Sequence, residues 1–147
     1  MLKNIVIALF AAVLLSGCSS STGRYGSETQ KHITEFEKVV GDRVHFALNS
    51  SSLSPMAKKT LMRQAAWLKN HTAFKIRVEG HCDERGTTEI NIALGESRAD
   101  TVKRFLVSKG VSANSIDTIS YGKERPAVIG NNESAWKMNR RSVTSIR

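Results

Sequence analysis

Two oppositely charged residues, Asp83 and Arg98, have the types and positions that best suit this chain to bind a ligand. Asp83 follows a segment predicted to be a strand, and Arg98 lies within the helix predicted after the intervening loop. A carboxylate binds an ammonium group, and a guanidinium binds a carboxylate through two parallel hydrogen bonds. Beside the free backbone donors of a helix start, the pair is suited to a zwitterion such as an amino-acid head group. A structural salt bridge that closes the loop onto the helix is the alternative.

Asn91 is a further candidate for the same site. It precedes Arg98 by two helical turns and lies on nearly the same face of the predicted helix. An amide there can add a polar contact to a ligand that the two charged groups hold.

Catalytic chemistry has little support in the sequence. There is no Gly-x-Ser-x-Gly motif, and adjacent carboxylates such as those of Asp83 and Glu84 rarely flank one bond from opposite sides. No second cysteine or histidine pair has the spacing of metal ligands. We therefore expect no enzyme activity, no metal site and no cofactor. The four histidines are spread over the chain: His32, His45, His71 and His81.

The elements that must position Asp83 begin with a strand and a helix. Apolar and polar residues alternate over Arg43 to Leu48, as in a half-buried strand. Ser54 is a suitable N-cap, and Pro55 is favoured at the first helical position. The pattern predicts a helix from there to about Asn70.

A second strand and helix flank the candidate site directly. Alternation predicts a strand over Phe74 to Gly80 and a loop over His81 to Thr87. Apolar residues at helical spacing then predict a helix from about Thr88 to Lys109, with Thr87 as its cap and Gly110 as its stop.

The C-terminal part is predicted to supply two more strands, Ile116 to Tyr121 and Ser142 to Arg147. Between them, Gly122 to Asn139 is predicted to be rich in loops, with one helical turn near Trp136. This order predicts a single α/β or α+β domain with a mixed sheet, with helices on one face and crossover helices that join parallel neighbours.

The N-terminus is typical of a secretory signal. Lys3 precedes an apolar run over Ile5 to Leu15, which at about eleven residues is too short to span a bilayer. The four residues ending in Cys18 resemble the lipobox of bacterial lipoproteins. The resemblance predicts that residues 1–17 are removed and that Cys18 is acylated as a membrane anchor.

A flexible tether is predicted after the anchor, over residues 18–29, because the segment is rich in Ser and Gly and nearly free of apolar side chains. The folded domain is predicted over residues 30–147. The formal net charge of +9 suits anionic partners in general. The basic residues are scattered along the chain rather than clustered, and the export signal is present as well, so both argue against nucleic acid as a partner. Cys82 is left without a partner, so no disulfide is expected.

Several separated motifs resemble the OmpA-like peptidoglycan-binding domain, and in detail the lipoproteins of that family. The resemblance extends from about Val44 to the C-terminus. It implies an α+β domain with βαβαββ order, a mixed sheet and helices on one face. The motifs are Gly80 to Thr87 continuing through Asn91, Leu94 to Ala99, Ser120 to Pro126, and Asn139 to Arg141.

The resemblance implies a function as well. It implies an outer-membrane lipoprotein whose periplasmic domain binds the diaminopimelate of the peptidoglycan stem peptide, with TolB and other Tol proteins as partners in envelope integrity and cell division. Asp83 and Arg98 match the family residues that hold the ligand. Ala47 departs from the family pattern, which leaves open a structural adaptor for TolB that binds the wall weakly or not at all. Weaker site candidates from neighbouring motifs are Asn49, His81 and Arg141.

Overall fold

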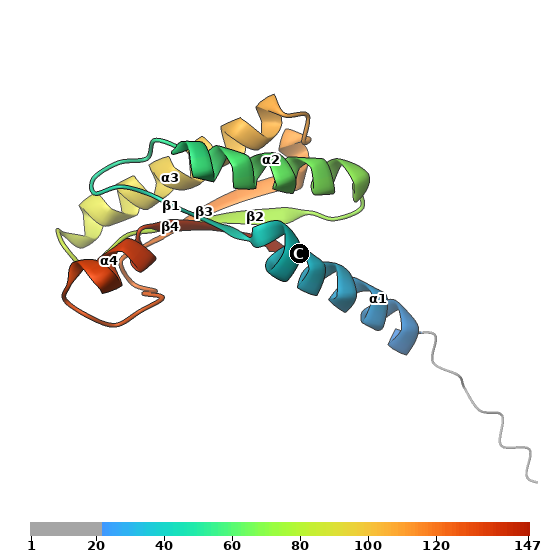
Figure 1. The fold of residues 1–147 in the computed structure, drawn as a ribbon, viewed down its shortest axis with the longest axis horizontal. Coiled ribbons are helices and arrows are strands. Elements are labelled where there is room, and N and C mark those ends of the chain that lie inside the picture. Colours follow the sequence, from blue (N-terminus) through green and yellow to red (C-terminus); the bar gives the residue numbers. More distant parts are fainter. Residues whose placement is uncertain (1–21) are drawn as a thin grey trace, which may run out of the picture.

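The computed structural model describes residues 22–147, and its elements run from helix α1 to strand β4 (Figure 1). The predicted signal peptide, residues 1–17, lies outside the described residues. So do the predicted lipidation site Cys18 and the first part of the predicted tether, to residue 21.

Residues 22–29, which we predicted to be flexible, are helical in the structure. Helix α1 spans Thr22–Glu35 and continues directly into a π-helical segment, η1, Phe36–Gly41. Phe36 is buried in the core, and the ring of His32 packs edge-on against Trp67 with 6.1 Å between centroids. Because the C-terminal end of the helix is fixed to the body, the preceding residues extend an existing helix rather than nucleate a new one.

The first strand, β1 (Arg43–His45), is shorter than predicted. Its partner β4 begins only at Arg141, so the last cross-strand contact is the Phe46 N–H donating to the carbonyl of Arg140 at 2.9 Å. Helix α2 (Pro55–Asn70) begins and ends where predicted. The Ser54 hydroxyl caps it by accepting the Ala57 N–H at 3.1 Å.

Strand β2 (Ile76–His81) and helix α3 (Thr88–Ser108) lie within two residues of their predicted bounds. A short 3-10 helix, η2 (Ala113–Ser115), then leads into β3 (Ile116–Gly122). The predicted helical turn near Trp136 is the two-turn helix α4 (Glu133–Asn139), which is followed by β4 (Arg141–Ile146).

The sheet is mixed, with strand order β1-β4-β2-β3. Helix α3 joins the parallel neighbours β2 and β3, as predicted. Helix α2 does not join neighbouring strands, because β4 lies between β1 and β2 and pairs antiparallel with both. Local periodicity predicts each strand but carries no information on which strand it pairs with.

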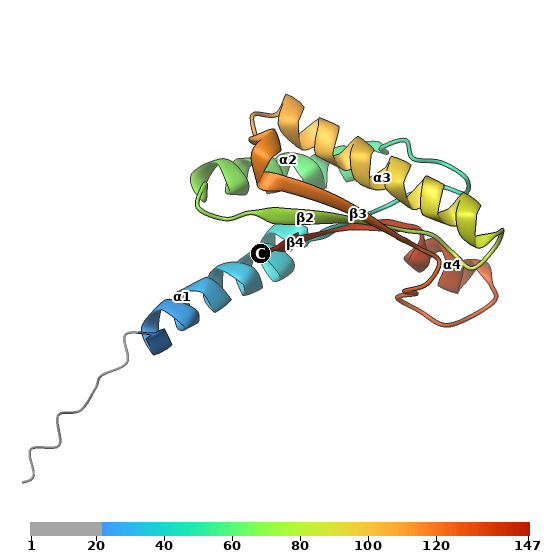
Figure 2. The ribbon, with the colours of Figure 1, turned by 180° about the vertical axis from the view of Figure 1, so that it is seen from behind.

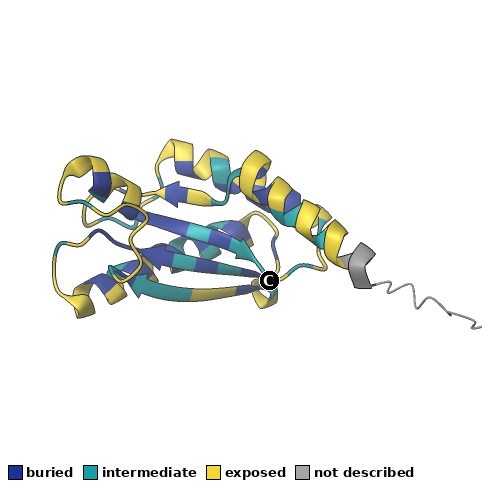
Figure 3. Ribbon diagram, turned by 90° about the horizontal axis from the view of Figure 1, so that it is seen from below, coloured by how far each residue is buried: buried dark blue, intermediate teal, exposed yellow. Residues whose placement is uncertain are grey.

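Helices α2 and α3 lie side by side over one face of the sheet (Figures 1 and 2), which confirms the predicted layering. The opposite face of the sheet is partly exposed (Figure 3). It carries the alternate strand residues, which in β2 include Arg77 and Glu79. Helix α1 projects at one end of the domain, and α4 lies at the other.

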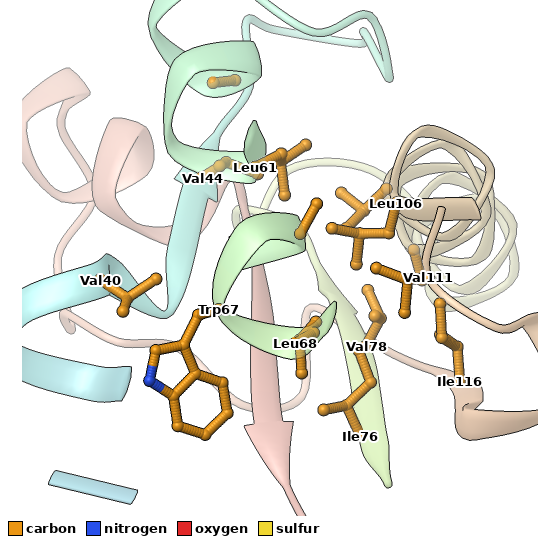
Figure 4. Packing of buried hydrophobic residues seen from close by; sticks show 14 of the residues in the cluster. Val40, Val44, Leu61, Trp67, Leu68, Ile76, Val78, Leu106, Val111 and Ile116 are labelled. Carbon is orange, nitrogen blue, oxygen red and sulfur yellow. The ribbon is translucent and has the colours of Figure 1, made fainter. Parts of the chain in front are cut away.

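The core fills the space between the sheet and the two covering helices (Figure 4). Removal of this apolar area from water is the main stabilising contribution to the fold. Among residues 22–147, no helix is long and apolar enough to cross a membrane. The core includes Val44, Leu61, Leu68, Ile76, Val78, Leu106, Val111 and Ile116.

Candidate functional site

The loop between β2 and α3 brings Asp83 close to the start of a helix. The loop turns at Gly86, whose φ of 94° lies in the left-handed region that glycine adopts without strain. Thr87 then caps α3, because its hydroxyl accepts the Ile90 N–H at 3.3 Å. Asp83 follows β2 by two residues and is buried beneath this turn.

Asp83 and Arg98 line one small pocket. Asn91 contributes from α3, and Asn49 from the loop that follows β1. Four of the six residues predicted for the site therefore lie together, although they come from three separate segments of the chain. The remaining lining residues are Leu48, Cys82, Arg85 and Leu94.

The carboxylate of Asp83 is paired with two arginines. Arg85 donates to both carboxylate oxygens, and Arg140 Nη1 approaches Oδ2 at 3.4 Å. The Arg85 backbone N–H also donates to Oδ1, at 3.1 Å. Burial alone would raise the pKa of Asp83, but these hydrogen bonds and charges outweigh it and lower the pKa below its usual value. The group is therefore an anion at neutral pH.

Arg98 is almost completely buried, and its hydrogen bonds go to three backbone carbonyls. Nε donates to Ser50, Nη1 to His81 and Nη2 to Ala47, at 2.8, 2.8 and 3.1 Å. The guanidinium also lies 5.2 Å from the ring centroid of Phe46. Burial lowers the pKa of Arg98, although the group remains charged near neutral pH. Arg98 thus holds the loop after β1 against the end of β2 with a full positive charge at the pocket.

Asn91 fixes the shape of the loop above the pocket. Its Nδ2 donates to the carbonyls of Arg85 and Thr87, both at 2.9 Å. The thiol of Cys82 packs beneath and donates to the Asn91 carbonyl at 3.2 Å, and burial raises the pKa of that thiol. Cys82 is free and buried, as expected for a small packed residue.

Asn49 adopts a left-handed backbone conformation, with φ of 53°. Asparagine tolerates this region better than most residues because its side chain is short and polar. Asn49 thus shapes the turn that carries Leu48 to the rim of the pocket.

His81 and Arg141, the other two candidates, do not line this pocket. The His81 ring packs against Tyr121 with 5.4 Å between centroids, and its contribution to the site is the carbonyl that accepts from Arg98. Arg141 donates to the carbonyls of Asn139 and Arg125, so it ties β4 to the preceding loop.

The sequence did not indicate Arg85 and Arg140 as site residues, although both lie in motifs that resemble those of the family. Arg85 also lies over the ring of Trp136, 3.9 Å from its centroid, and the indole N–H of Trp136 donates to Glu84 at 3.1 Å. These contacts dock α4 against the site loop. The signal available in sequence was the concentration of arginines near one carboxylate, because a lone buried Asp requires cationic or hydrogen-bonding partners.

The pocket therefore has a positive balance around one anion. Arg85, Arg98 and Arg140 surround Asp83, and Arg140 is additionally paired with Glu133 at the surface. A ligand that brings a carboxylate to Arg98 and an amine to Asp83 matches this distribution.

The comparisons with known proteins agree with this description of the fold. Residues 45–140 match the model of the OmpA family, so the chain belongs to the OmpA family. Within the family it resembles the peptidoglycan-associated lipoproteins. The protein of that name from Mesorhizobium japonicum is 43% identical over 152 residues, covering 97% of this chain and 90% of the relative. The one from Haemophilus influenzae is 38% identical over 147 residues, which cover 96% of this chain and 95% of the relative.

Solved structures support the same assignment. The crystal structure of the peptidoglycan-associated lipoprotein from Burkholderia pseudomallei matches with a TM-score of 0.74 and 34% identity, covering 78% of this chain and 98% of that one. The C-terminal domain of Helicobacter pylori MotB matches with a TM-score of 0.67 at 21% identity. The match covers 72% of this chain and 84% of that one, and it shows a shared fold.

Proposed function

We propose that this protein is an outer-membrane lipoprotein that binds peptidoglycan non-covalently and links the outer membrane to the cell wall. The observation that carries the proposal is the presence of Asp83 and Arg98 in one pocket. The ligand is the diaminopimelate of the stem peptide, whose free amine and carboxylate have the two charges that the pocket matches. The names of the relatives support the same role.

The binding mode follows from the hydrogen-bonding capacity of the two groups. A guanidinium has five N–H donors, and three of those of Arg98 already go to backbone carbonyls. We assign the remaining N–H groups, which also interact with the neighbouring Cys82 thiol, to the carboxylate of the ligand. The ammonium takes its place on Asp83, where it replaces or shares the contacts of Arg85.

Anchoring at Cys18 keeps the domain close to the wall. Helix α1 has 14 residues and is about 21 Å long, so it acts as a spacer between the acylated terminus and the binding domain. A tethered domain facing a dense lattice of stem peptides stays bound through high effective concentration even when each contact is weak. Each charge-assisted hydrogen bond contributes about 1.5–3 kcal/mol.

Co-sedimentation with purified sacculi tests the proposal. We expect the wild-type protein to pellet and Asp83→Ala to remain largely in the supernatant. Matched controls lie on the exposed face of α3, two and six residues beyond Arg98, where Asp100 and Arg104 form a surface pair. Asp100→Ala and Arg104→Ala should pellet like the wild type. Equal pelleting of Asp83→Ala and Asp100→Ala would contradict the proposed site.

The carboxylate of the ligand offers an independent test. Sacculi in which this diaminopimelate carboxylate is amidated present no anion to Arg98, and we expect them to pellet much less protein. The same samples should release no soluble wall fragments, because binding without cleavage is proposed.

The Tol proteins, chiefly TolB, are the proposed protein partners. A binding assay between the purified protein and TolB, with and without soluble stem peptide, measures this interaction and its dependence on the wall ligand. A wild-type protein that binds TolB but does not pellet with sacculi would support the adaptor role in place of wall binding.

A further inference from the structure

A second cluster of ligand-type side chains lies at the end of the domain opposite the Asp83 pocket, where α1 meets the C-terminal end of α2 (Figure 1). It consists of His32 and Glu35 on α1 and His71, the C-cap residue of α2. One ligand atom from each residue lies within 4.8 Å of the others. From this geometry we propose a binding site for a divalent transition metal, with Zn²⁺ as the best match.

The separation between His32 and Glu35 is that of two ligands rather than of a hydrogen bond. Nδ1 of His32 lies 3.7 Å from Oε2 of Glu35. This Nδ1 is buried, and it makes no hydrogen bond with the residues that the structure describes. Two ligands on a tetrahedral Zn²⁺ with bonds of about 2.0–2.1 Å are about 3.4 Å apart. A metal ion between the two atoms gives the nitrogen the partner that it lacks here.

His71 is oriented in the way metal-binding histidines usually are. Its Nδ1 lies 2.8 Å from the carbonyl oxygen of Trp67. A carbonyl can only accept, so Nδ1 carries the proton and Nε2 has the free lone pair. A backbone carbonyl that fixes the tautomer of a ligating histidine is a recurrent feature of metal sites.

The aromatic surroundings hold the two imidazoles in place. The His71 ring stacks on Trp67 with 3.8 Å between centroids and an interplanar angle of 10°. The His32 ring packs edge-on against His71 at 4.9 Å and against Phe74 at 5.6 Å. These contacts limit ring rotation, so less conformational entropy is lost when a metal binds.

The ligand set determines the metal class. Two imidazoles and one carboxylate are a common set for Zn²⁺, with water in the fourth position. Glu35 is exposed, so the fourth position faces solvent. A bound ion would connect α1 to α2 and so fix the direction in which α1 leaves the domain. The sequence could not indicate this site, because His32 and His71 lie on different elements that only the fold brings together.

Titration of the tag-free, full-length protein with ZnCl₂ in a calorimeter tests the site, with Co²⁺ absorption as a second readout. We expect one Zn²⁺ per chain and a visible Co²⁺ spectrum of a low-coordinate site. Glu35→Gln, His32→Gln and His71→Gln should each weaken Zn²⁺ binding about 10- to 100-fold or more. Glu35→Gln is the key variant, because this side chain is exposed and its change leaves the core intact.

The controls are residues of the same types outside the ligand set. Glu28→Gln changes another carboxylate on α1, and His45→Gln changes an exposed histidine on β1. Both should bind Zn²⁺ like the wild type. Unchanged affinity in Glu35→Gln and His71→Gln, or an equal loss in His45→Gln, would overturn the proposal. Sacculus pelleting of Glu35→Gln should match the wild type, so failure here is distinguishable from failure of wall binding.

Discussion

The guanidinium of Arg85 donates to both carboxylate oxygens of Asp83, with Nε at 3.2 Å from Oδ1 and Nη2 at 2.8 Å from Oδ2. The residue proposed to receive the ligand ammonium is therefore already occupied by a cation from its own loop. Arg85 is about one third exposed, and its guanidinium lies on the ring of Trp136.

Removal of this internal competitor should strengthen wall binding. We expect Arg85→Ala to bind sacculi up to about fivefold more tightly, because the ligand no longer has to displace a partly exposed ion pair. Arg85→Lys keeps the positive charge but not the two parallel hydrogen bonds, so its affinity for sacculi should lie between those of the wild type and Arg85→Ala. A loss of binding in Arg85→Ala, measured by sacculus sedimentation over a protein concentration series, would instead make Arg85 a direct ligand contact.

Asn49 allows the role of a side chain to be separated from that of the backbone. Its φ of 53° is accessible to glycine without strain, so Asn49→Gly should keep the turn and its stability to within a few tenths of a kcal/mol. Asn49→Val, a β-branched residue in the same conformation, should lower the free energy of unfolding by about 1–2 kcal/mol. Urea denaturation measures both.

The same pair tests whether the amide of Asn49 contacts the wall ligand. If Asn49→Gly is as stable as the wild type but pellets less with sacculi, the side chain contributes to binding. Equal pelleting would restrict Asn49 to shaping the turn that presents Leu48.

Strand β2 and helix α3 approach each other closely at two glycines. A Cβ on Gly80 would overlap the backbone carbonyl of Gly95. The backbone at either glycine can move only if β2 or α3 is displaced with it. We expect Gly80→Ala to lower the free energy of unfolding by about 2–3 kcal/mol, as overpacking does. It should also weaken wall binding, because α3 carries Arg98.

Gly26 on α1 is the matched control for that substitution. A Cβ there meets nothing within 4 Å, and Ala is the better helix former, so Gly26→Ala should be neutral or stabilising by up to about 1 kcal/mol. Denaturant midpoints of the two variants measure the difference. A Gly80→Ala protein as stable as Gly26→Ala would show that β2 and α3 are not packed as closely as described.

Helices α2 and α3 were predictable from the sequence because their signals are local. Ser54 and Thr87 cap α2 and α3 through hydrogen bonds of 3.1 and 3.3 Å, and the positions of both were evident from residue type alone. The proximity of Asp83 and Arg98, which line one pocket, was also predictable, since one follows a strand and the other lies on the next helix. Cap residues and helical spacing depend on neighbours within one or two turns.

Features that depend on distant contacts were not predictable. The insertion of β4 between β1 and β2 involves pairing across most of the chain, for example His45 with Arg141. The pairing of Arg140 with Asp83 depends on where α4 docks. The helical start of α1 depends on the anchoring of Phe36 in the core. Residue type and periodicity do not encode such contacts, because they arise only when separate segments pack.

The imidazole of His81 provides a pH-dependent test of how the end of β2 is packed. The side chain is 3% exposed, its Nε2 lies 3.4 Å from Glu79, and its ring packs against Tyr121. Burial lowers the pKa of His81 to about 4, and the positive charges of Arg141 and Arg125 contribute. The ordinary pKa of histidine is 6.5.

Between these two pKa values the unfolded chain binds a proton at His81 that the folded protein does not. The stabilisation from keeping this ring neutral is therefore complete above pH 6.5 and is lost as the pH falls toward 4, by up to about 3 kcal/mol. From pH 7 to pH 5, wild-type protein should lose about 2 kcal/mol more of its unfolding free energy than His81→Gln, which has no titrating ring. Urea denaturation at both pH values measures this difference, and the carboxylates common to both proteins cancel. If the unfolding free energies of the wild type and His81→Gln changed in parallel with pH, the His81 ring would gain a proton without cost. The end of β2 would then be open to water rather than closed by Tyr121.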